Sequence, residues 1–303
     1  MIEQEDNNGC NPQTIKRLNI IGCGRAAGSL AKLWVELGLP AIGQLLNRTP
    51  QSTAAAAREL RSGEAAVSIG QMAPADCWLI GTPDQQIAGV AEELAAAGRG
   101  LENALVFHLA GRFGTEVLAP LRERDCLLAA VHPVRSLTHE TLELADFAGT
   151  ACVAEGDALA LKRLEPLIVA IGGAWLPVQN IDRGLYHAAL SIVSNVTKGV
   201  AWKAQNWLQS SGLPAPTAVA ITQQLLATTV EDIARSGAKQ SITGPVVRGD
   251  TSTVVAHLGA LQNGPAADVD LYQVLARVVL ELAVERGDLD EKTLRDFERL
   301  LYF

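Results

Sequence analysis

A predicted helix in the second half of the chain carries polar side chains of the types that take part in catalysis. The helical pattern runs over residues 182–208, and its polar face holds His187, Ser191, Ser194, Asn195, Lys198 and Trp202. A solvated helix face usually has many charged residues, but this face has no carboxylate. Its hydroxyl, amide and imidazole groups could bond to a carbonyl, an imine or a carboxylate, and Lys198 or His187 could supply a proton.

We therefore predict that four of these side chains line a reacting centre: His187, Ser191, Asn195 and Lys198. The opposite face is apolar and holds Leu185, Ala189, Ile192, Val196 and Val200. The alternative is a helix buried on both sides, whose small polar residues bond only to their neighbours.

Near the start of the chain, a glycine pattern lies between a predicted strand, Leu18–Gly22, and a helix that begins near Arg25. The pattern is Gly22-x-Gly24-x-x-Ala27. Gly22 permits a tight turn, Gly24 lets a pyrophosphate approach the backbone, and Ala27 lets the helix pack closely on the strand. The helix N-terminus offers free N–H groups to a phosphate, with Arg25 as a further contact. An ordinary glycine-rich turn is the alternative to this dinucleotide site.

The end of the second predicted strand, Ile42–Leu46, indicates which dinucleotide binds. It is followed by Asn47, Arg48 and Thr49. An NAD site has a carboxylate near this place for the ribose 2′-hydroxyl, whereas here no carboxylate repels a 2′-phosphate and Arg48 can pair with one. We expect NADP, with all three residues among its contacts, unless the segment only caps the next helix.

The ends of later predicted strands supply further candidate residues. Thr82, Pro83 and Asp84 follow the strand Cys77–Gly81 and are expected beside the nicotinamide ribose, although Asp84 is better explained as a helix cap. His108 ends the next strand, and its loop contains Gly111.

His132 follows the strand after that, and Arg112 and Arg135 lie close to the two histidines in the sequence. Histidine titrates near neutral pH and can move protons, so His108, Gly111 and His132 predict a crevice for an anionic substrate. For each histidine a purely structural role is the alternative.

One loop in the last third of the chain has the composition of an anion clamp. Thr243 and Gly244 precede a proline turn, Arg248 follows, and Asp250 is placed to cap the next helix. We predict that Thr243, Gly244 and Arg248 contact the substrate; a plain interhelical loop is the alternative.

Two kinds of pattern divide the chain. Between residues 18 and 178 short apolar runs alternate with helical patterns, which predicts an α/β domain with a mainly parallel, doubly wound sheet and a ligand crevice at the carboxyl ends of its strands. The predicted strands are Leu18–Gly22, Ile42–Leu46, Ala66–Ile69, Cys77–Gly81, Ala104–Leu109, Leu127–Val131, Thr150–Ala154 and Ala174–Val178. From residue 182 only long helical patterns remain. We predict a disordered tail over residues 1–16, a nucleotide-binding domain over 17–180 and an all-α domain over 181–303.

The composition limits the function classes. The 303 residues are 48% hydrophobic and 19% charged, enough for a large core. A formal net charge of −8 and the lack of any basic run argue against a nucleic-acid footprint. Five widely spaced cysteines indicate reduced thiols and no metal site. Because no signal peptide or membrane-length apolar run is apparent, we expect a soluble, cytoplasmic protein.

The motifs of the first half resemble the NADP-binding domain of the superfamily that contains ketopantoate reductase, pyrroline-5-carboxylate reductase and F420-dependent NADP oxidoreductase. They are Gly22-x-Gly24-x-x-Ala27, Asn47-Arg48-Thr49 and Thr82-Pro83-Asp84. Over nearly the whole chain after the tail, the sequence also resembles Rossmann-like proteins with a C-terminal helical domain of unknown function. The segments that carry this resemblance are His108-x-x-Gly111, His132-Pro133, Tyr186-His187-Ala188-Ala189, Ser194-Asn195 and residues 243–250.

These resemblances imply an NADP-linked oxidoreductase whose helical domain is of the 6-phosphogluconate dehydrogenase C-terminal type. They also imply a homodimer through that domain and an active site between the domains. We expect hydride transfer between NADPH and a C=O or C=N group of a small carboxylated metabolite. The alternatives are a non-catalytic NADP-binding sensor or scaffold and an F420-dependent NADP reductase. In β-hydroxyacid dehydrogenases a helix lysine precedes an asparagine by one turn, whereas here Asn195 precedes Lys198, so that pairing is not carried over.

Overall fold

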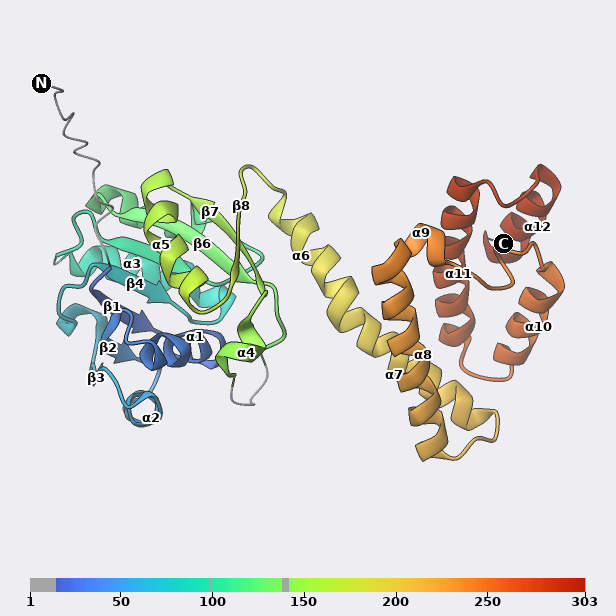
Figure 1. The fold of residues 1–303 in the computed structure, drawn as a ribbon, viewed down its shortest axis with the longest axis horizontal. Helices are drawn as coiled ribbons and strands as arrows, with labels where there is room; N and C mark the ends of the chain where they lie inside the picture. Colours follow the sequence, from blue (N-terminus) through green and yellow to red (C-terminus); the bar gives the residue numbers. More distant parts are fainter. Residues whose placement is uncertain (1–14, 99, 138–141, 303) are drawn as a thin grey trace, which may run out of the picture. The chain divides into compact units, whose positions relative to one another are not determined.

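The computed structural model describes residues 15–98, 100–137 and 142–302 (Figure 1). Its contacts divide the chain into two compact units, residues 1–197 and 198–303. The predicted tail over residues 1–16 lies outside the described part except for its last two residues, of which Ile15 is buried. The sequence analysis placed the domain boundary at residue 180 because the helical patterns take over there. That boundary stays a prediction, since the two units are defined by contacts between residues and not by composition.

The first unit is built on one eight-stranded sheet with the order β3-β2-β1-β4-β5-β6-β7-β8. Within the described residues, β6 and β7 form the one antiparallel pair, and all other neighbouring strands are parallel. The strands are β1 (Arg17–Ile21), β2 (Ala41–Leu46), β3 (Glu64–Ala65), β4 (Cys77–Ile80), β5 (Leu105–His108), β6 (Leu127–Pro133), β7 (Ala151–Gly156) and β8 (Ala174–Pro177). The mainly parallel, doubly wound sheet predicted from the sequence is therefore confirmed.

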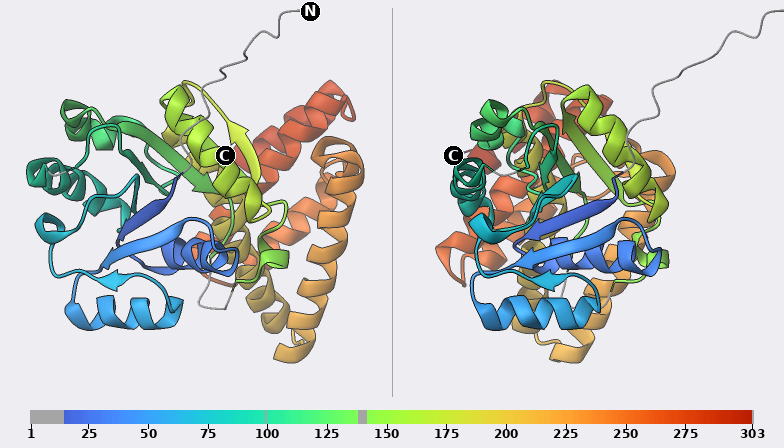
Figure 2. Two further views of the ribbon diagram at one scale, coloured as in Figure 1. Left: turned by 60° about the vertical axis from the view of Figure 1, so that its left-hand side comes forward. Right: turned by 90° about the vertical axis from the view of Figure 1, so that its left-hand side faces the viewer.

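Helices cover both faces of this sheet (Figure 2). They are α1 (Arg25–Glu36), α2 (Pro50–Leu60), α3 (Ile87–Ala97), α4 (Leu144–Phe147) and α5 (Ala158–Ala170), with the 3₁₀ segments η1 (Ile69–Gln71), η2 (Asp84–Gln86) and η3 (Thr115–Arg124). Successive strand residues point to opposite faces, so Ile20 and Leu79 pack under α1 and α5, whereas Ile21 and Ile80 pack under α3 and η3. Because helices cover both faces of the sheet, the sequences of its central strands are continuous runs of apolar residues and do not alternate with polar ones.

One predicted strand in this unit was wrong, and two other segments differ from regular α-helix. The third strand is Glu64–Ala65, not Ala66–Ile69, because Val67 is 80% exposed and Ile69 begins a 3₁₀ turn. The segment Thr115–Arg124, with Pro120 inside it, is 3₁₀ and not α-helical. Leu37 ends α1 as its C-cap and is exposed, so it is not part of the buried face of that helix.

The second unit is entirely helical in its described residues. Its helices are α7 (Thr197–Ser210), α8 (Ala215–Ser236), α9 (Ala238–Ser241), α10 (Thr251–Leu261), α11 (Ala266–Arg286) and α12 (Glu291–Tyr302). Its small core is formed by Val246, Val254, Ala276, Leu280, Phe297 and Leu301. Asp250 caps α10 as predicted, by accepting a hydrogen bond from the amide of Thr253. No helix in the described residues is long and apolar enough to cross a membrane.

The polar helix of the sequence analysis comprises three consecutive pieces. The first, α6 (Arg183–Ser191), is capped by Asp182, whose side chain accepts a hydrogen bond from the amide of Leu185. It is followed by one π-helical turn, η4 (Ile192–Val196), and then by α7. A π turn holds one more residue than an α turn and shifts the faces that follow it. The uniform helical spacing assumed for residues 182–202 was therefore wrong.

Candidate functional site

The glycine loop joins β1 to α1 at the carboxyl edge of the sheet. Gly22 has a φ of +86°, and a Cβ there would lie 2.5 Å from the backbone nitrogen of Thr82, so the turn requires glycine. Gly24 is the N-cap of α1, and a Cβ built on it meets no atom within 4 Å. A Cβ on Gly81 would lie 2.4 Å from the Cβ of Ala27, so the small residue at 27 lets α1 lie against the end of β4.

Asn47 fastens this loop to the end of β2. Its Oδ1 accepts a 2.7 Å hydrogen bond from the amide of Cys23, and its Nδ2 donates to the carbonyl of Ser52. Thr49 is the N-cap of α2, and its hydroxyl accepts a bond from the amide of Ser52. Asn47 and Thr49 were both predicted as cofactor contacts, and both also have a structural role. Asn47 holds the glycine loop, and Thr49 caps the next helix, which was the alternative interpretation of this segment. Arg48 lies between them, is exposed, and forms no hydrogen bond or ion pair with any described residue.

A pocket of about 350 Å³ opens at this edge. Its lining residues are Gly22, Cys23, Gly24, Asn47, Arg48, Thr49, Ser52, Gly81, Thr82, Pro83 and Gln86. Of the ten predicted cofactor residues, Arg25, Ala27 and Asp84 are not in this lining. The lining contains no carboxylate and one cation, Arg48, which suits an anionic ligand.

The helix cap predicted at Asp84 was wrong. Asp84 is the first residue of η2, and neither η2 nor α3 has a side-chain cap, because Pro83 and Gln86 stand at their N-cap positions. Cys23, Ser52, Gly81 and Gln86 are lining residues that the sequence analysis missed. Ser52 and Gln86 lie in the first turns of the elements that follow the predicted loops, so extending each motif by one turn would have found them.

His108 has the environment of a structural histidine. It is fully buried, its Nε2 bonds to the carbonyl of Gly114 at 2.8 Å, and its Nδ1 accepts from the amide of Ala110 at 3.1 Å. Burial is the main cause that lowers the pKa of its ring. Both nitrogens therefore hold the turn after β5, and substrate contact by His108 stays a prediction.

His132 is placed differently, at the end of β6 with its ring beside the helix α6. Its Nδ1 lies 2.9 Å from the hydroxyl of Tyr186, and the two rings meet edge to face. Gly111 allows this arrangement, because a Cβ there would lie 2.7 Å from Cε1 of His132. Burial, with smaller contributions from His187 and Arg183, lowers the pKa of His132 to about 4, so the ring is neutral at neutral pH.

Arg183 and Tyr186 were missed as site residues by the sequence analysis. The Arg183 guanidinium is buried, bonds to Oε2 of Glu155 at 2.7 and 2.9 Å, and lies 5.7 Å from the ring of Tyr186. Burial raises the pKa of the Tyr186 hydroxyl. The available signal was their spacing, since residues three apart on a helix share a face.

The predicted catalytic residues are distributed along α6, η4 and the start of α7. His187, Asn195 and Lys198 are exposed, and Ser191 is half-buried. The hydroxyl of Ser194 lies 3.3 Å from that of Ser136, in the loop after β6, so the π turn faces the same edge of the sheet as His132. Thr197 closes the π turn by donating to the carbonyl of Ile192. Lys198 is the first residue of the second unit.

The predicted anion clamp lies in the second unit. Gly244 has a φ of +115°, and both Thr243 and Arg248 are exposed. The Asp250 carboxylate accepts bonds from Ser252 and Thr253, which lower its pKa to about 2. The loop can thus present Arg248 to an anion, and the predicted contacts at 243, 244 and 248 stay predictions.

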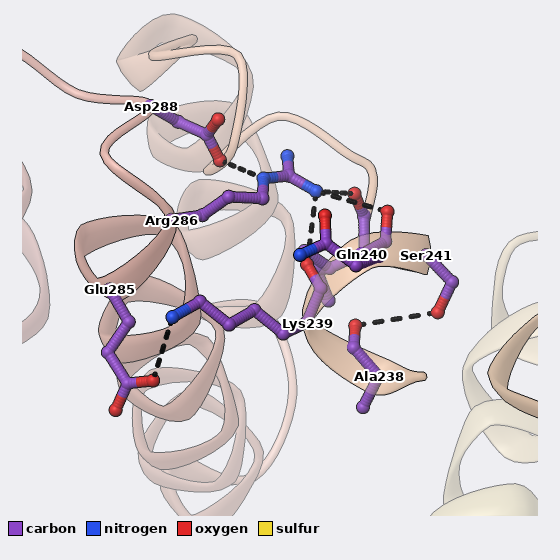
Figure 3. A network of polar contacts seen from close by, with 8 residues as sticks. Ala238, Lys239, Gln240, Ser241, Glu285, Arg286 and Asp288 are labelled. Atoms are coloured by element: carbon purple, nitrogen blue, oxygen red, sulfur yellow. Dashed lines mark hydrogen bonds and ion pairs between the residues drawn. The ribbon is translucent and has the colours of Figure 1, made fainter. Parts of the chain in front are cut away.

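Arg286 holds the start of this loop in place (Figure 3). Its Nη1 donates to the carbonyls of Lys239, Gln240 and Ile242, and its Nε is 2.6 Å from the carboxylate of Asp288. The guanidinium therefore satisfies carbonyls at the end of α9 that have no partner within their own helix. The sequence analysis did not single out Arg286.

Among the described residues, no group of three or more histidine, cysteine or acidic side chains could hold a metal ion. The four described cysteines are free, and burial raises the pKa of each thiol, to about 12 for Cys152. Cys10 lies outside the described residues.

Two family models match the chain. A Rossmann-like domain matches residues 1–133, and a domain of unknown function, DUF2520, matches residues 150–279. No curated protein matches the sequence.

Several solved structures share the fold. A putative NADP oxidoreductase, BF3122 from Bacteroides fragilis, is 21% identical with a TM-score of 0.71, and the match covers 88% of this chain and 98% of that one. Protein TM1727 from Thermotoga maritima is 23% identical with a TM-score of 0.69, over 89% and 99% of the two chains. A pyrroline-5-carboxylate reductase from Coxiella burnetii is 16% identical with a TM-score of 0.56, over 95% and 99%.

Proposed function

The chain carries a Rossmann-like domain followed by a DUF2520 domain, and from this premise we propose that it is an NADP(H)-dependent oxidoreductase. It transfers a hydride between NADPH and a C=O or C=N group of a small, carboxylated metabolite. The similar solved structures include proteins described as a putative NADP oxidoreductase and a pyrroline-5-carboxylate reductase, which agrees with this reaction class.

The observation that carries the proposal is the pocket at the glycine loop. Gly22 and Gly24 leave backbone exposed at the N-terminus of α1, where a pyrophosphate is stabilised by free N–H groups. At the end of β2 the pocket offers the unpaired guanidinium of Arg48 and no carboxylate, a set of groups that accepts a ribose 2′-phosphate. The same lining would be a poor site for NAD, because nothing in it accepts bonds from the 2′-hydroxyl as a carboxylate does.

The cofactor assignment is tested by titrating the protein with NADPH and NADH and following the fluorescence of the reduced nicotinamide. The wild type is expected to bind NADPH at least tenfold more tightly than NADH, since a charge-assisted bond contributes about 1.5–3 kcal/mol. Arg48→Ala should remove this preference by weakening NADPH alone. Arg58→Ala is the matched control, because Arg58 is an exposed arginine on α2 outside the pocket lining.

Equal affinity for the two nucleotides in the wild type would contradict the assignment to NADP. Absence of binding by either nucleotide would contradict the dinucleotide site itself. If Arg48→Ala still preferred NADPH over NADH, the 2′-phosphate would have to be bound by another residue.

The geometry also supports a proton donor for the reaction. NADPH, when bound, supplies the hydride, and the oxygen or nitrogen of the reduced group must then receive a proton from the protein. The Tyr186 hydroxyl stays protonated at neutral pH, and its neighbour His132 is neutral. If Nδ1 of His132 carries the ring hydrogen, it donates to the tyrosine oxygen and leaves the Tyr186 O–H free for the substrate.

We assign Tyr186 as this donor and His132 as the residue that positions it. The four side chains predicted from the sequence, His187, Ser191, Asn195 and Lys198, follow Tyr186 along the same helical stretch and are proposed as further substrate contacts. The carboxylate of the substrate is proposed to bind an arginine, with Arg248 as the candidate from the sequence.

Tyr186→Phe separates this role from cofactor binding. The variant keeps the aromatic ring and its contact with Arg183, so NADPH affinity should not change, while kcat on an accepted keto acid or cyclic imine should fall by about 10²- to 10⁴-fold. Tyr272→Phe is the matched control, because Tyr272 bonds to His257 with similar geometry in the second unit. An unchanged kcat in Tyr186→Phe would contradict the assignment. Tight NADPH binding without oxidation by any carbonyl, imine or deazaflavin acceptor would instead support the sensor alternative.

A further inference from the structure

A second pocket lies at the opposite edge of the sheet from the glycine loop. Its volume is about 390 Å³, and its walls include Arg17, Asp76, Asn103 and Arg163. Arg17 is the first residue of β1, Asp76 directly precedes β4, and Asn103 lies two residues before β5, so the pocket is at the amino ends of three parallel strands. Strands of this length separate the two edges by roughly 15 Å. The pocket is therefore not part of the nucleotide site.

Arg163 is the unusual residue of this pocket. It lies on the core-facing side of α5, among Ala160, Leu164 and Leu167, and only 7% of its surface is exposed. Its Nη1 donates to the carbonyl of Asn103 at 3.2 Å, and its Nε is buried without a partner. No carboxylate in the described residues forms an ion pair with it. A guanidinium removed from water without a counter-ion is unfavourable, so this position calls for a negative group.

The acidic residues in the walls of this pocket, Asp76 and Glu102, do not form an ion pair with Arg163. One oxygen of Asp76 accepts bonds from the amides of Lys16 and Arg17, at 3.1 and 2.9 Å, and so serves the backbone at the start of β1. Glu102 is exposed and makes no hydrogen bond or ion pair with a described residue.

The backbone around Arg163 is held by specific contacts. Asn103 adopts a left-handed conformation with a φ of +61°, and its amide donates to the carbonyl of Asp125, which leaves its own carbonyl for Arg163. Gly100, with a φ of +62°, packs so closely on Pro74 that a Cβ would lie 2.6 Å from the proline ring. The pocket walls are thus formed by defined turns.

We propose that this pocket binds a small molecule through a single carboxylate or phosphate group, with Arg163 as its anchor. The planar guanidinium can donate two parallel bonds to such a group, and Arg17 is a second basic residue of the lining. Asp76 and Glu102 in the same lining suit a ligand that also carries an amine, as an amino acid does. The inference does not depend on the nucleotide reaction.

The test uses calorimetric titration of the full chain with inorganic phosphate and with alanine, at constant ionic strength. All variants carry Arg48→Ala, so that a response at the glycine loop is weakened in every sample. The Arg48→Ala protein is expected to give a saturable response to phosphate, to alanine or to both, which identifies the anionic group that fits. Adding Arg163→Met keeps the aliphatic stem and should weaken binding at least tenfold. Adding Arg122→Met is the control, because Arg122 is exposed, pairs with Asp157 and lies outside the pocket.

A second variant guards against a folding defect. Arg163→Lys keeps the positive charge but cannot donate two parallel hydrogen bonds, so it should bind the probe several-fold more weakly than the parent protein. The proposal is overturned if the Arg48→Ala protein shows no saturable response to either probe. It is also overturned if Arg163→Met, or Arg163→Lys where the methionine variant does not fold, binds with the affinity of the parent.

Discussion

His132 joins a strand end to the helix α6 through one hydrogen bond, and its surroundings give the site a defined pH dependence. Nδ1 of the ring forms a hydrogen bond with the Tyr186 hydroxyl. Burial is the main cause that opposes protonation of the ring, and His187, Arg183 and His108 add to this effect. Its pKa of about 4 in the folded protein compares with 6.5 in an unfolded chain. Between these values the unfolded state binds more protons than the folded state, so stability rises with pH across this window.

The expected result is a loss of stability as the pH falls from about 6.5 to about 4, of at most about 3 kcal/mol from His132. His132→Asn should reduce this slope, measured as the midpoint of urea unfolding at several pH values. His108, whose pKa is also lowered by burial, leaves a residual slope in the variant. His257→Asn is the control, since His257 makes the same kind of bond to Tyr272 but is exposed. Identical slopes in wild type and His132→Asn would contradict the pKa assigned to this ring.

At the scale of elements, a helix or strand with a regular pattern of apolar residues could be predicted from the sequence. An element whose shape depends on contacts with residues far away in the sequence could not. The strands β1, β4 and β5 are short runs buried on both faces, and their predicted ends lie within two residues of the observed ones. The π turn η4 has no such signature, because its extra residue is visible only when the carbonyl of Ile192 is seen to bond to Thr197. The same limit applies to the site. His132 and Tyr186 are 54 positions apart in the sequence, and no periodic pattern between them would bring the two side chains together.

The short helix α9 depends on a side chain from another element and should respond to its loss. In Arg286→Met the carbonyls of Lys239, Gln240 and Ile242 lose a charged donor, so local opening of residues 237–250 should become easier by about 2 kcal/mol. Amide exchange there should accelerate about 30-fold. Arg277→Met, on the same helix α11, removes only a contact with the ring of Tyr302 and is the control. Unchanged exchange in residues 237–250 would show that the loop holds its shape without Arg286.

At the scale of the whole molecule, the second unit has many large apolar side chains that are exposed in one chain. Exposed large apolar side chains on α8 are Val219, Ile221, Leu225, Leu226, Val230 and Ile233. Further ones on α11 are Val274, Leu275, Val278 and Val284. Many exposed apolar side chains on neighbouring turns of a helix are typical of an interaction surface. The sequence analysis expected a homodimer through the helical domain, and we propose that α8 forms part of its interface.

The proposed dimer can be tested by measuring the mass of the assembly in solution, without reference to the sheet domain. Light scattering after gel filtration should give the wild type twice the mass of one chain. Leu225→Asp combined with Val230→Asp places charges where side chains are 65% and 64% exposed in one chain, so the fold should persist while association weakens. Gln224→Asp, exposed on the same helix but polar already, is the matched control. NADPH affinity should be equal in all three proteins, because the glycine loop lies in the first unit. A wild type that stays monomeric at high concentration, or a double variant that stays dimeric, would place Leu225 and Val230 of α8 outside any self-association.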